Sequence, residues 1–300
     1  MQTFSEFQKL HSVKDIIRWA ASRFNEAKLD YGHGMSTAID EAVYLTLHGL
    51  HLAIDTPATY WDAMVTDTEK EQLYALLKRR IDERIPAAYI TQEGWFAGLP
   101  FFVDERVLVP RSPIAELVDT QFAPWVDPEE VESILDLCTG SGCIGIACAY
   151  AFPGAEVELA DISQDALDVA TINIQRHDAA SQVTTVQSDG LKQLEGRSYD
   201  IIVSNPPYVD AEDMAALSDE FKHEPELGLS SGEDGLDLTR HILQTAAGHL
   251  NDNGILVVEV GNSQYALQSA FPHVPFHWLD FERGGDGVFL LTKEQLERFF

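Results

Sequence analysis

Four consecutive residues after a buried apolar run have the side chains that binding a planar nitrogen group requires. They are Asn205, Pro206, Pro207 and Tyr208. The side-chain oxygen of Asn205 and the carbonyl of Pro206 can each accept one of the two N–H bonds of a carboxamide or an exocyclic amine. These acceptors would stabilise positive charge that develops on the nitrogen, and the face of Tyr208 can stack on the planar group. We therefore predict catalytic roles for Asn205, Pro206 and Tyr208, and substrate contacts for all four residues.

A purely structural explanation accounts for the two prolines of this pattern. Two prolines after a buried strand end the ladder and hold the following loop in an extended path. That explanation does not account for the flanking Asn205 and Tyr208. The same geometry suits a glutamine amide and the exocyclic amines of adenine and guanine. The four residues therefore indicate chemistry at a planar nitrogen, and the choice of substrate needs other features.

A second group of residues that could bind a ligand follows the apolar run at 133–137. It comprises Asp136, Cys138, Thr139, Gly140, Ser141 and Gly142. Glycines at positions 140 and 142 allow a tight turn and a close approach of the backbone to a ligand, and Gly145 allows a helix to pack closely on a strand. A strand, a glycine turn and a helix in this order are typical of a nucleotide-binding unit.

These glycines also have the GxGxxG spacing of dinucleotide enzymes, and Asp161, after the next strand, suits a ribose hydroxyl in either case. Asp136 favours one alternative, because its carboxylate would repel the pyrophosphate of NAD, whereas S-adenosylmethionine carries a cationic sulfonium and an ammonium group. Asp189 follows the third strand and would accept a hydrogen bond from the adenine amine, with a plain turn aspartate as the alternative. We therefore predict S-adenosylmethionine as the cofactor, bound by this turn together with Asp161 and Asp189.

The elements that must position these residues alternate between strand and helix. Strands are predicted at 133–137, 157–160, 183–187, 200–204 and 254–260, with helices beginning near 143, 164, 238 and 264. The last two runs, 276–281 and 287–291, are joined by too few residues for a helical crossover, so we expect an antiparallel hairpin at the sheet edge. The repeated units predict an α/β fold, a mostly parallel sheet with helices on both faces. With its one antiparallel strand, this sheet resembles the Rossmann-like seven-stranded sheet of methyltransferases.

The region before these units is organised differently. Apolar residues recur at helical spacing from Val13 to about Pro86, which predicts a small helical N-terminal domain over 1–88. Thr68 and Glu71 have the spacing of a capping box that opens its last helix. Short β-like runs predict a hairpin linker over 89–123, and the methyltransferase domain is expected over 124–300. The helical domain carries no identifiable chemistry, so substrate docking and simple packing are both open for it.

The composition limits the classes of protein to which this chain can belong. No apolar stretch reaches the roughly 18 to 20 residues of a membrane span, and the N-terminal sequence lacks a signal-peptide pattern, which predicts a cytoplasmic protein without membrane contact. The 3 cysteines and 10 histidines fit no zinc or disulfide pattern, so we expect no metal site. A formal charge of −29 opposes direct nucleic-acid binding and favours basic partners, and solubility alone explains it equally well.

Several motifs together resemble those of the protein-(glutamine) N-methyltransferase family over nearly the whole chain. They are segments 31–34, 83–89, 107–116 and 223–229, along with the two motifs above. The resemblance implies that residues 138–142, Asp161 and Asn205 line a pocket for S-adenosylmethionine, and that residues 205–208 grip a glutamine side chain. It also implies that Arg111 contacts the substrate and that Glu116 shapes the site, with a role in loop structure as the alternative for both.

The segment after Arg111 distinguishes two branches of this family. It reads Ser-Pro-Ile-Ala-Glu, whereas the release-factor enzymes usually have Pro-Glu-Thr-Glu. The difference favours the branch that modifies a glutamine of large-subunit ribosomal protein L three, a basic partner for an acidic chain. Gly190 stands where the release-factor branch tends to have an aromatic residue, so no adenine-stacking role is assigned to it.

Four alternatives stay open at this point. They are a release-factor glutamine methyltransferase, an adenine-amine nucleic-acid methyltransferase, a nicotinamide-dependent oxidoreductase and an inactive ribosome-assembly factor. The nucleic-acid enzyme would flip its target base into the same pocket, but the basic channel that it needs is not evident in the sequence. Whether the substrate is free ribosomal protein or an assembly intermediate is also open.

Overall fold

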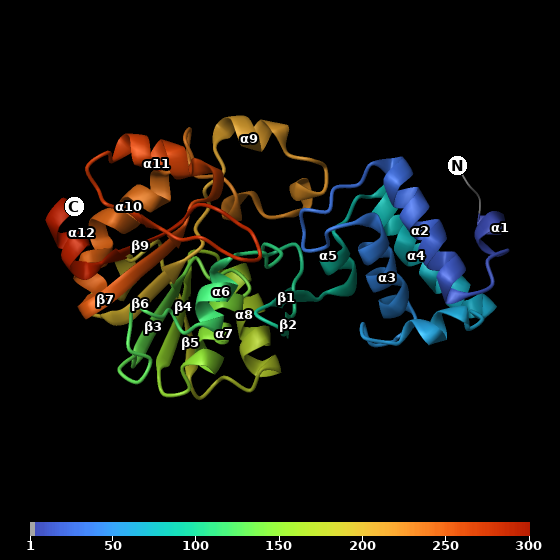
Figure 1. Ribbon diagram of the computed structural model, residues 1–300, viewed down its shortest axis with the longest axis horizontal. Coiled ribbons are helices and arrows are strands. Elements are labelled where there is room, and N and C mark those ends of the chain that lie inside the picture. Colours follow the sequence, from blue (N-terminus) through green and yellow to red (C-terminus); the bar gives the residue numbers. More distant parts are fainter. Residues whose placement is uncertain (1–3) are drawn as a thin grey trace. The chain divides into compact units, whose positions relative to one another are not determined.

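The computed structural model describes residues 4–300, which divide into two compact units (Figure 1). The first contains the described residues up to Glu93 together with Ser218–His223, and the second contains Gly94–Leu217 and Glu224–Phe300. The predicted domain boundaries at 88 and 123 stay a prediction, and residues 1–3 of the first domain lie outside the described residues. The hairpin region from Gly94 groups with the second unit because Phe96 and Phe101 are buried in its core.

The first unit is helical, as predicted. Its helices are α1 (Phe4–Phe7), α2 (Val13–Ala27), α3 (Ala38–Gly49), α4 (Asp67–Asp82) and α5 (Ala87–Thr91), with a 3-10 helix η1 (Ala58–Asp62) and a second, η3 (Phe221–His223), from the inserted segment. Apolar side chains three or four residues apart on α2, α3 and α4 meet in one core, which includes Ile16, Leu45 and Leu73.

Helix α4 begins earlier than the capping-box prediction placed it. The sequence holds two overlapping Thr-x-x-Glu pairs, and the structure uses the first: the Glu69 amide donates to the Thr66 hydroxyl, and the Thr66 amide donates to the Glu69 carboxylate at 2.7 Å. The prediction for Thr68 was therefore wrong. Thr66 has the extended backbone that a capping residue needs, whereas Thr68 already lies inside the helix.

A buried ionic cluster lies between α3, α4 and the segment Ser218–His223. The Arg80 side chain, 1% exposed, donates to Glu41 at 2.6 Å and to the Asp30 carbonyl at 2.7 Å. Glu220 accepts from Arg84 at 2.8 Å and lies 3.4 Å from Arg80. Because Arg80, Glu41 and Glu220 are almost fully removed from water, the charge of each depends on its partners.

The motif at 31–34 packs around the same inserted segment. The ring of Phe221 lies 4.3 Å from the ring of His33, measured between centroids. A Cβ atom on Gly32 would lie 2.8 Å from the Phe221 ring, so a larger residue would displace that ring. The glycine and the histidine of this motif thus serve the packing of a segment that is remote in sequence.

The second unit is built on a 7-stranded sheet with the order β5-β4-β3-β6-β7-β9-β8. Its strands are β3 (Ser133–Leu137), β4 (Glu156–Asp161), β5 (Val183–Gln187), β6 (Tyr199–Ser204), β7 (Leu250–Glu259), β8 (His277–Trp278) and β9 (Val288–Thr292). Strands β3 to β7 pair in parallel, and β9 is antiparallel to both β7 and β8. The predicted α/β sheet with an antiparallel hairpin at its edge is confirmed.

Helices cover both faces of this sheet (Figure 1). They are α6 (Ile114–Asp119), α7 (Cys143–Ala151), α8 (Gln164–Arg176), α10 (Asp237–Thr245), α11 (Gln264–Ala270) and α12 (Lys293–Phe299), and a further short helix, α9 (Ala211–Ala216), follows β6 without burying a side chain. The unit also contains the hairpin β1 (Gly94–Phe96) and β2 (Leu99–Phe101) and the 3-10 helices η2 (Lys192–Leu194), η4 (Glu226–Gly228), η5 (Ala246–His249) and η6 (Gly261–Ser263). Successive residues of β3 point to opposite faces, with Ile134 in the core under α6, α7 and α8 and Leu135 in the core under α10 and α12.

Three short helices of the second unit, α6, α9 and α12, have no counterpart among the predicted elements, and α6 lies within the predicted hairpin linker over 89–123. Helix α9 buries no side chain, and α12 buries only Leu296. A helix without an apolar stripe leaves no periodic signal in the sequence. Among residues 4–300, no helix is long and apolar enough to cross a bilayer. The same residues contain no cluster of His, Cys, Asp and Glu suited to a metal ion, and the cysteines are free thiols.

Candidate active site

The sheet brings the two predicted motifs to one edge. Strands β3 and β6 pair in parallel with Leu137 opposite Ser204, and the Ser204 hydroxyl donates to the Leu137 carbonyl at 2.6 Å. The residues that follow, Cys138 and Asn205, therefore leave the sheet side by side at its carboxyl edge. Ligands of open α/β sheets bind at this edge, where neighbouring strands lead to helices on opposite faces.

Two carboxylates organise the glycine turn after β3. One Asp136 oxygen, Oδ2, accepts hydrogen bonds from the Thr139 hydroxyl at 2.5 Å and from the Gly145 amide at 2.8 Å. Asp161 accepts from the Gly140 amide at 2.9 Å and from the Ser163 amide at 2.9 Å. The turn is thus tied to the ends of both β3 and β4.

Close packing explains the glycine at position 145. A Cβ atom there would lie 2.2 Å from Leu159 and 2.9 Å from the Cβ of Asp136. Gly140 has a φ of +55° and Gly142 a φ of +82°, and a Cβ on Gly140 would meet no atom within 4 Å. The backbone at Gly140 therefore borders open space, as a turn that approaches a ligand requires.

The second oxygen of Asp136 distinguishes this site from an ordinary turn. Its Oδ1 is buried and has no hydrogen-bond partner among the residues that the structure describes. Burial raises the pKa of Asp136 to about 7, against the hydrogen bonds from Thr139 and Gly145, which lower it. Burial likewise raises the pKa of Asp161. Two desolvated carboxylates beside an open glycine turn fit a cationic ligand such as S-adenosylmethionine, which neutralises them, and would repel a pyrophosphate.

This burial predicts a pH dependence of stability. The native state keeps a proton on Asp136 up to about pH 7, whereas the ordinary pKa of an aspartate, as in the unfolded chain, is 3.8. The native state therefore binds the additional proton between these limits, and the free energy of unfolding of the ligand-free enzyme is expected to fall as pH rises through this range. At roughly 1.4 kcal/mol per unit, the loss is on the order of 4 kcal/mol.

The Asp136→Asn variant isolates this contribution. Its side-chain oxygen can keep both hydrogen bonds of Oδ2 while the titration is removed, so urea unfolding between pH 4.5 and 8 is expected to show a flatter pH dependence than wild type. Asp55→Asn, at an exposed loop position, serves as the control with an unchanged slope. Equal slopes for wild type and Asp136→Asn would refute the buried titration.

The loop after β6 presents two hydrogen-bond acceptors without partners. Within the described residues, neither the carboxamide of Asn205 nor the carbonyl of Pro206 takes part in a hydrogen bond. Asn205 is half-buried and Pro206 is buried. Both acceptors belong to a backbone that leaves the sheet beside the glycine turn. They are available to the two N–H bonds of a planar amide, the role predicted for them.

The hydroxyl of Tyr208, in contrast, has a hydrogen-bond partner within the protein. The phenol donates to Glu259 at 3.0 Å, and burial, with the nearby Glu259 charge, raises the pKa of Tyr208 above its usual value. The hydroxyl therefore stays protonated, and only the ring is available for the predicted stacking on substrate. Pro207 lies between these residues and is half-buried.

Arg111 is placed in a bidentate ion pair. Its guanidinium donates to the two oxygens of Glu224 at 2.6 and 2.8 Å, and the Val109 amide donates to the same carboxylate at 2.9 Å. The pair fastens the extended segment before α6 to the loop that follows the inserted segment. A substrate contact by Arg111 stays a prediction, since the structure shows the role in loop structure that was its alternative.

Glu116 and Asp189 also have protein partners. Glu116 accepts from the backbone amides of Glu282 and Arg283 at 2.9 and 2.7 Å. Asp189 pairs with Lys192 at 2.5 Å and is half-exposed. Glu116 thus holds the loop between β8 and β9. An adenine contact by Asp189 would compete with its lysine partner, and this role also stays a prediction.

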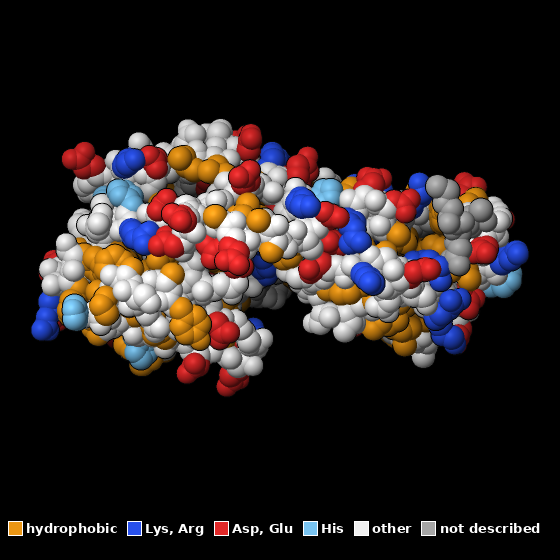
Figure 2. Space-filling view, turned by 90° about the horizontal axis from the view of Figure 1, so that it is seen from above, with side chains coloured by type: hydrophobic (Ala, Val, Ile, Leu, Met, Phe, Trp, Pro, Cys, Tyr) orange, Lys and Arg blue, Asp and Glu red, His pale blue; other side chains and the backbone are white. Residues whose placement is uncertain are grey.

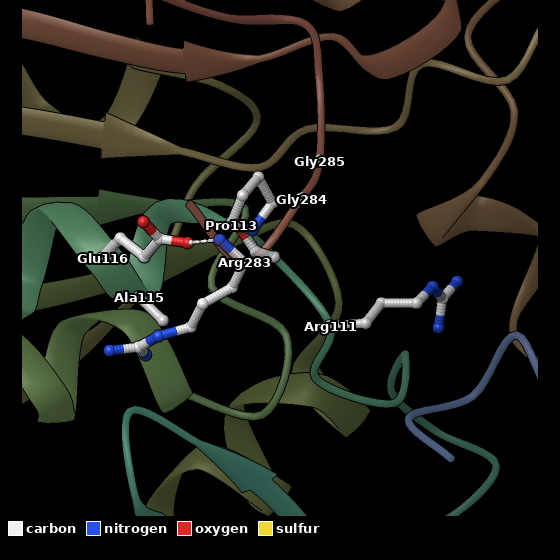
Figure 3. Close-up of a pocket in the computed structure, with 8 residues that line it drawn as sticks. Arg111, Pro113, Ala115, Glu116, Arg283, Gly284 and Gly285 are labelled. Carbon is white, nitrogen blue, oxygen red and sulfur yellow. Dashed lines mark hydrogen bonds between the residues drawn. The ribbon is translucent and has the colours of Figure 1, made fainter. Parts of the chain in front are cut away.

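A cavity of about 350 Å³ lies between the segment around Pro113 and the loop at 283–285 (Figure 3). Its polar lining comes from Arg111, Ser112, Glu116 and Arg283. Figure 3 shows the Arg111 side chain directed away from the other labelled residues. Arg111 is the one lining residue that was predicted to contact substrate, and the residues of the glycine turn do not line this cavity.

Glu259 is the residue of this edge that sequence reasoning missed. It ends β7, and β7 pairs with β6 so that Val258 lies opposite Ser204. Glu259 and Asn205 therefore occupy equivalent positions just beyond the paired residues. The signal in the sequence was a carboxylate that directly follows the apolar run 254–258, a costly residue for the end of a buried strand.

Comparison with known proteins gives the family. Residues 121–232 match the family described as the methyltransferase small domain. The ribosomal protein uL3 glutamine methyltransferase of Neisseria gonorrhoeae is 51% identical over 291 residues, which cover 96% of this chain and 97% of that protein. The chain belongs to this family of protein-glutamine methyltransferases. The protein of the same name from Neisseria meningitidis serogroup B is 50% identical over 291 residues, covering 96% of this chain and 95% of the relative.

Family membership makes the chain an enzyme, a methyltransferase whose cofactor is S-adenosylmethionine. The nicotinamide-dependent oxidoreductase and the inactive assembly factor are thereby set aside. Among solved structures, a methyltransferase from Pyrococcus furiosus superposes with a TM-score of 0.47 at 20% identity, over 65% of this chain and 89% of that chain.

Proposed function

We propose that this enzyme transfers a methyl group from S-adenosylmethionine to the side-chain amide nitrogen of a glutamine in ribosomal protein uL3, the large-subunit protein L three. The observation that supports it most directly is the pair of unpartnered acceptors, Asn205 and Pro206, at the sheet edge that also carries the glycine turn. The identity of about 50% to enzymes named for this reaction, over 96% of the chain, supports the choice of substrate.

Asp136, Asp161 and the turn at 138–142 would hold the cofactor, which supplies an electrophilic methyl group when bound. The lone pair of a carboxamide nitrogen is delocalised into its carbonyl, so this nitrogen is a poor nucleophile. Asn205 and Pro206 would accept its two N–H bonds and stabilise the positive charge that develops on it. Fixing the nitrogen in the direction of attack would supply much of the rate, because proximity contributes roughly 7 to 11 kcal/mol in favourable cases.

The proposal also covers the cellular location of the reaction, the state of its substrate and the roles of the two domains. With a ribosomal protein as substrate, the reaction takes place in the cytoplasm, on free uL3 or on an assembly intermediate, without direct nucleic-acid contact by the enzyme. The helical domain over 1–88 would dock the substrate, and the methyltransferase domain over 124–300 would carry out the chemistry. Glutamine in a release factor and the exocyclic amine of adenine are the competing substrates.

A parallel assay separates these substrates. Purified enzyme with methyl-labelled cofactor is incubated separately with uL3, a peptide release factor, DNA and RNA. Label is expected in uL3, and mass spectrometry of its peptides is expected to place a single additional methyl group on one glutamine. Label in the release factor or in nucleic acid, with none in uL3, would refute the proposal.

Charge gives a further expectation for this substrate. The chain carries a net charge of −29, and acidic side chains are spread over the face shown in Figure 2 rather than gathered in one patch. Attraction of a basic protein to such a surface is screened by salt over about 10 Å at 0.1 M ionic strength. KM for isolated uL3 is expected to rise severalfold between 50 and about 300 mM salt, with kcat little changed. A salt-independent KM would show that charge does not guide the substrate.

A further inference from the structure

Glu259 is a buried carboxylate whose hydrogen-bond partners are hydroxyl groups. It is 5% exposed, and its two oxygens accept from the Tyr208 hydroxyl at 3.0 Å and from the Ser112 hydroxyl at 2.5 Å. Within the described residues no lysine or arginine forms an ion pair with it, and the nearby Arg111, which pairs with Glu224, lowers the pKa of Glu259 only through its charge. Burying a carboxylate costs free energy unless donors compensate for the lost water, so these two contacts are the principal reason that it is tolerated there.

Glu259 holds the hydroxyl of Tyr208, and residues that follow Glu259 hold the ring edge and the backbone of Tyr208. A Cβ atom on Gly261 would lie 2.6 Å from the edge of the Tyr208 ring, so the ring rests against this glycine. The Tyr208 carbonyl accepts from the Ser263 hydroxyl at 2.8 Å. One edge of the ring, its hydroxyl and its backbone are therefore all fixed by the segment from 259 to 263, directly after β7.

Ser112 links this network to the extended segment before α6. Its hydroxyl oxygen accepts from the Ile114 amide at 3.2 Å while its hydrogen is donated to Glu259. Ser112 therefore ties one oxygen of Glu259 to the backbone of the segment before α6. Three segments that are distant in sequence thus converge on one carboxyl group.

We propose that Glu259 is a positioning residue for methyl transfer, which sets the orientation of the Tyr208 ring against the substrate amide and is itself held by Ser112. The inference rests on the proposed function, because Tyr208 is there assigned the face that packs on the glutamine amide. Glu259 acts through the tyrosine hydroxyl and needs no contact of its own with the substrate.

A double-mutant cycle tests this assignment. Glu259→Ala is expected to lower kcat for uL3 methylation by about 10- to 100-fold through loss of alignment, with the Kd for S-adenosylmethionine within about twofold of wild type. In a Tyr208→Phe background the same change is expected to cost no more than about threefold, because the contact it removes is already absent. Multiplicative losses in the double variant would overturn the positioning role.

The Glu259→Gln variant distinguishes the effect of the hydrogen bonds of Glu259 from the effect of its negative charge. Its side-chain oxygen can accept from Tyr208 while its amide donates to Ser112, so the network is kept and the negative charge is lost. We expect kcat within about fivefold of wild type for this variant. Loss as large as that of the alanine variant would show that the charge itself acts on the reaction, contrary to the proposal. Glu156→Ala, at an exposed position at the start of β4, is the matched control without effect.

A readout without substrate keeps this proposal distinct from the proposed function. Tyrosine labelled at Cζ gives a resonance for Tyr208, assigned by its loss in Tyr208→Phe. This resonance is expected to shift in Glu259→Ala, much less in Glu259→Gln, and not in Glu156→Ala. An unchanged Tyr208 resonance in Glu259→Ala would overturn the positioning role whatever the substrate, whereas failure of the wild-type enzyme to methylate uL3 would overturn the proposed function.

Discussion

Replacing Asn205 with alanine is expected to lower kcat for uL3 methylation by a factor on the order of 10² to 10³, the usual cost of removing one preorganised group at a developing charge. The Asn205 carboxamide has no hydrogen-bond partner in the described structure, so its removal breaks no internal hydrogen bond. The loss is therefore expected in the chemical step, measured by single-turnover methylation at saturating cofactor, with little change in thermal stability.

Asn25→Ala is the control for this experiment, because Asn25 is an exposed asparagine on α2. Calorimetric titration of S-adenosylmethionine reports on the cofactor pocket separately. A few-fold rise in Kd is consistent with the predicted place of Asn205 beside that pocket. A kcat within about threefold of wild type would contradict the acceptor role of Asn205.

Replacing Arg80 with methionine is expected to lower the free energy of unfolding by about 3 to 5 kcal/mol, the usual result of breaking a buried ion pair from one side. Arg80 is 1% exposed and contacts Glu41, Glu220 and the Asp30 carbonyl. Without it, Glu41 is left as a buried carboxylate with its compensating donor removed. Urea unfolding at pH 8 measures the change, and Arg79→Met, at the exposed neighbouring position, is expected to change stability by less than about 0.5 kcal/mol.

The pH dependence of this loss follows from the same burial. Burial raises the pKa of Glu41 even in the presence of Arg80. When the arginine is removed, the protonated form of Glu41 is favoured further, and protonation removes the uncompensated charge. The destabilisation caused by Arg80→Met is therefore expected to be smaller at pH 5 than at pH 8. A loss that grows as pH falls would contradict the ionic role of Arg80.

The sequence by itself determined the architecture of the second unit. Apolar runs of strand length, alternating with helical periodicity, placed β3 and β5 at their observed bounds and predicted the sheet with its antiparallel edge hairpin. The glycine turn and Asn205 were also readable, because each follows a strand directly and parallel strands end at a common edge. In these cases the information is local, carried by residue type and by spacing within a single βα unit.

The tertiary structure alone decided which side chains meet. Glu259 contacts Ser112 and Tyr208, which lie 147 and 51 residues away along the chain, and Glu220 lies 140 residues from Arg80. Hydrophobic periodicity records which face of an element is buried but not which element covers it. Strand order and loop path set those pairings, and hydrogen bonding in the buried interior then fixed the partners of each charge, including the protein partners of Arg111 and Asp189.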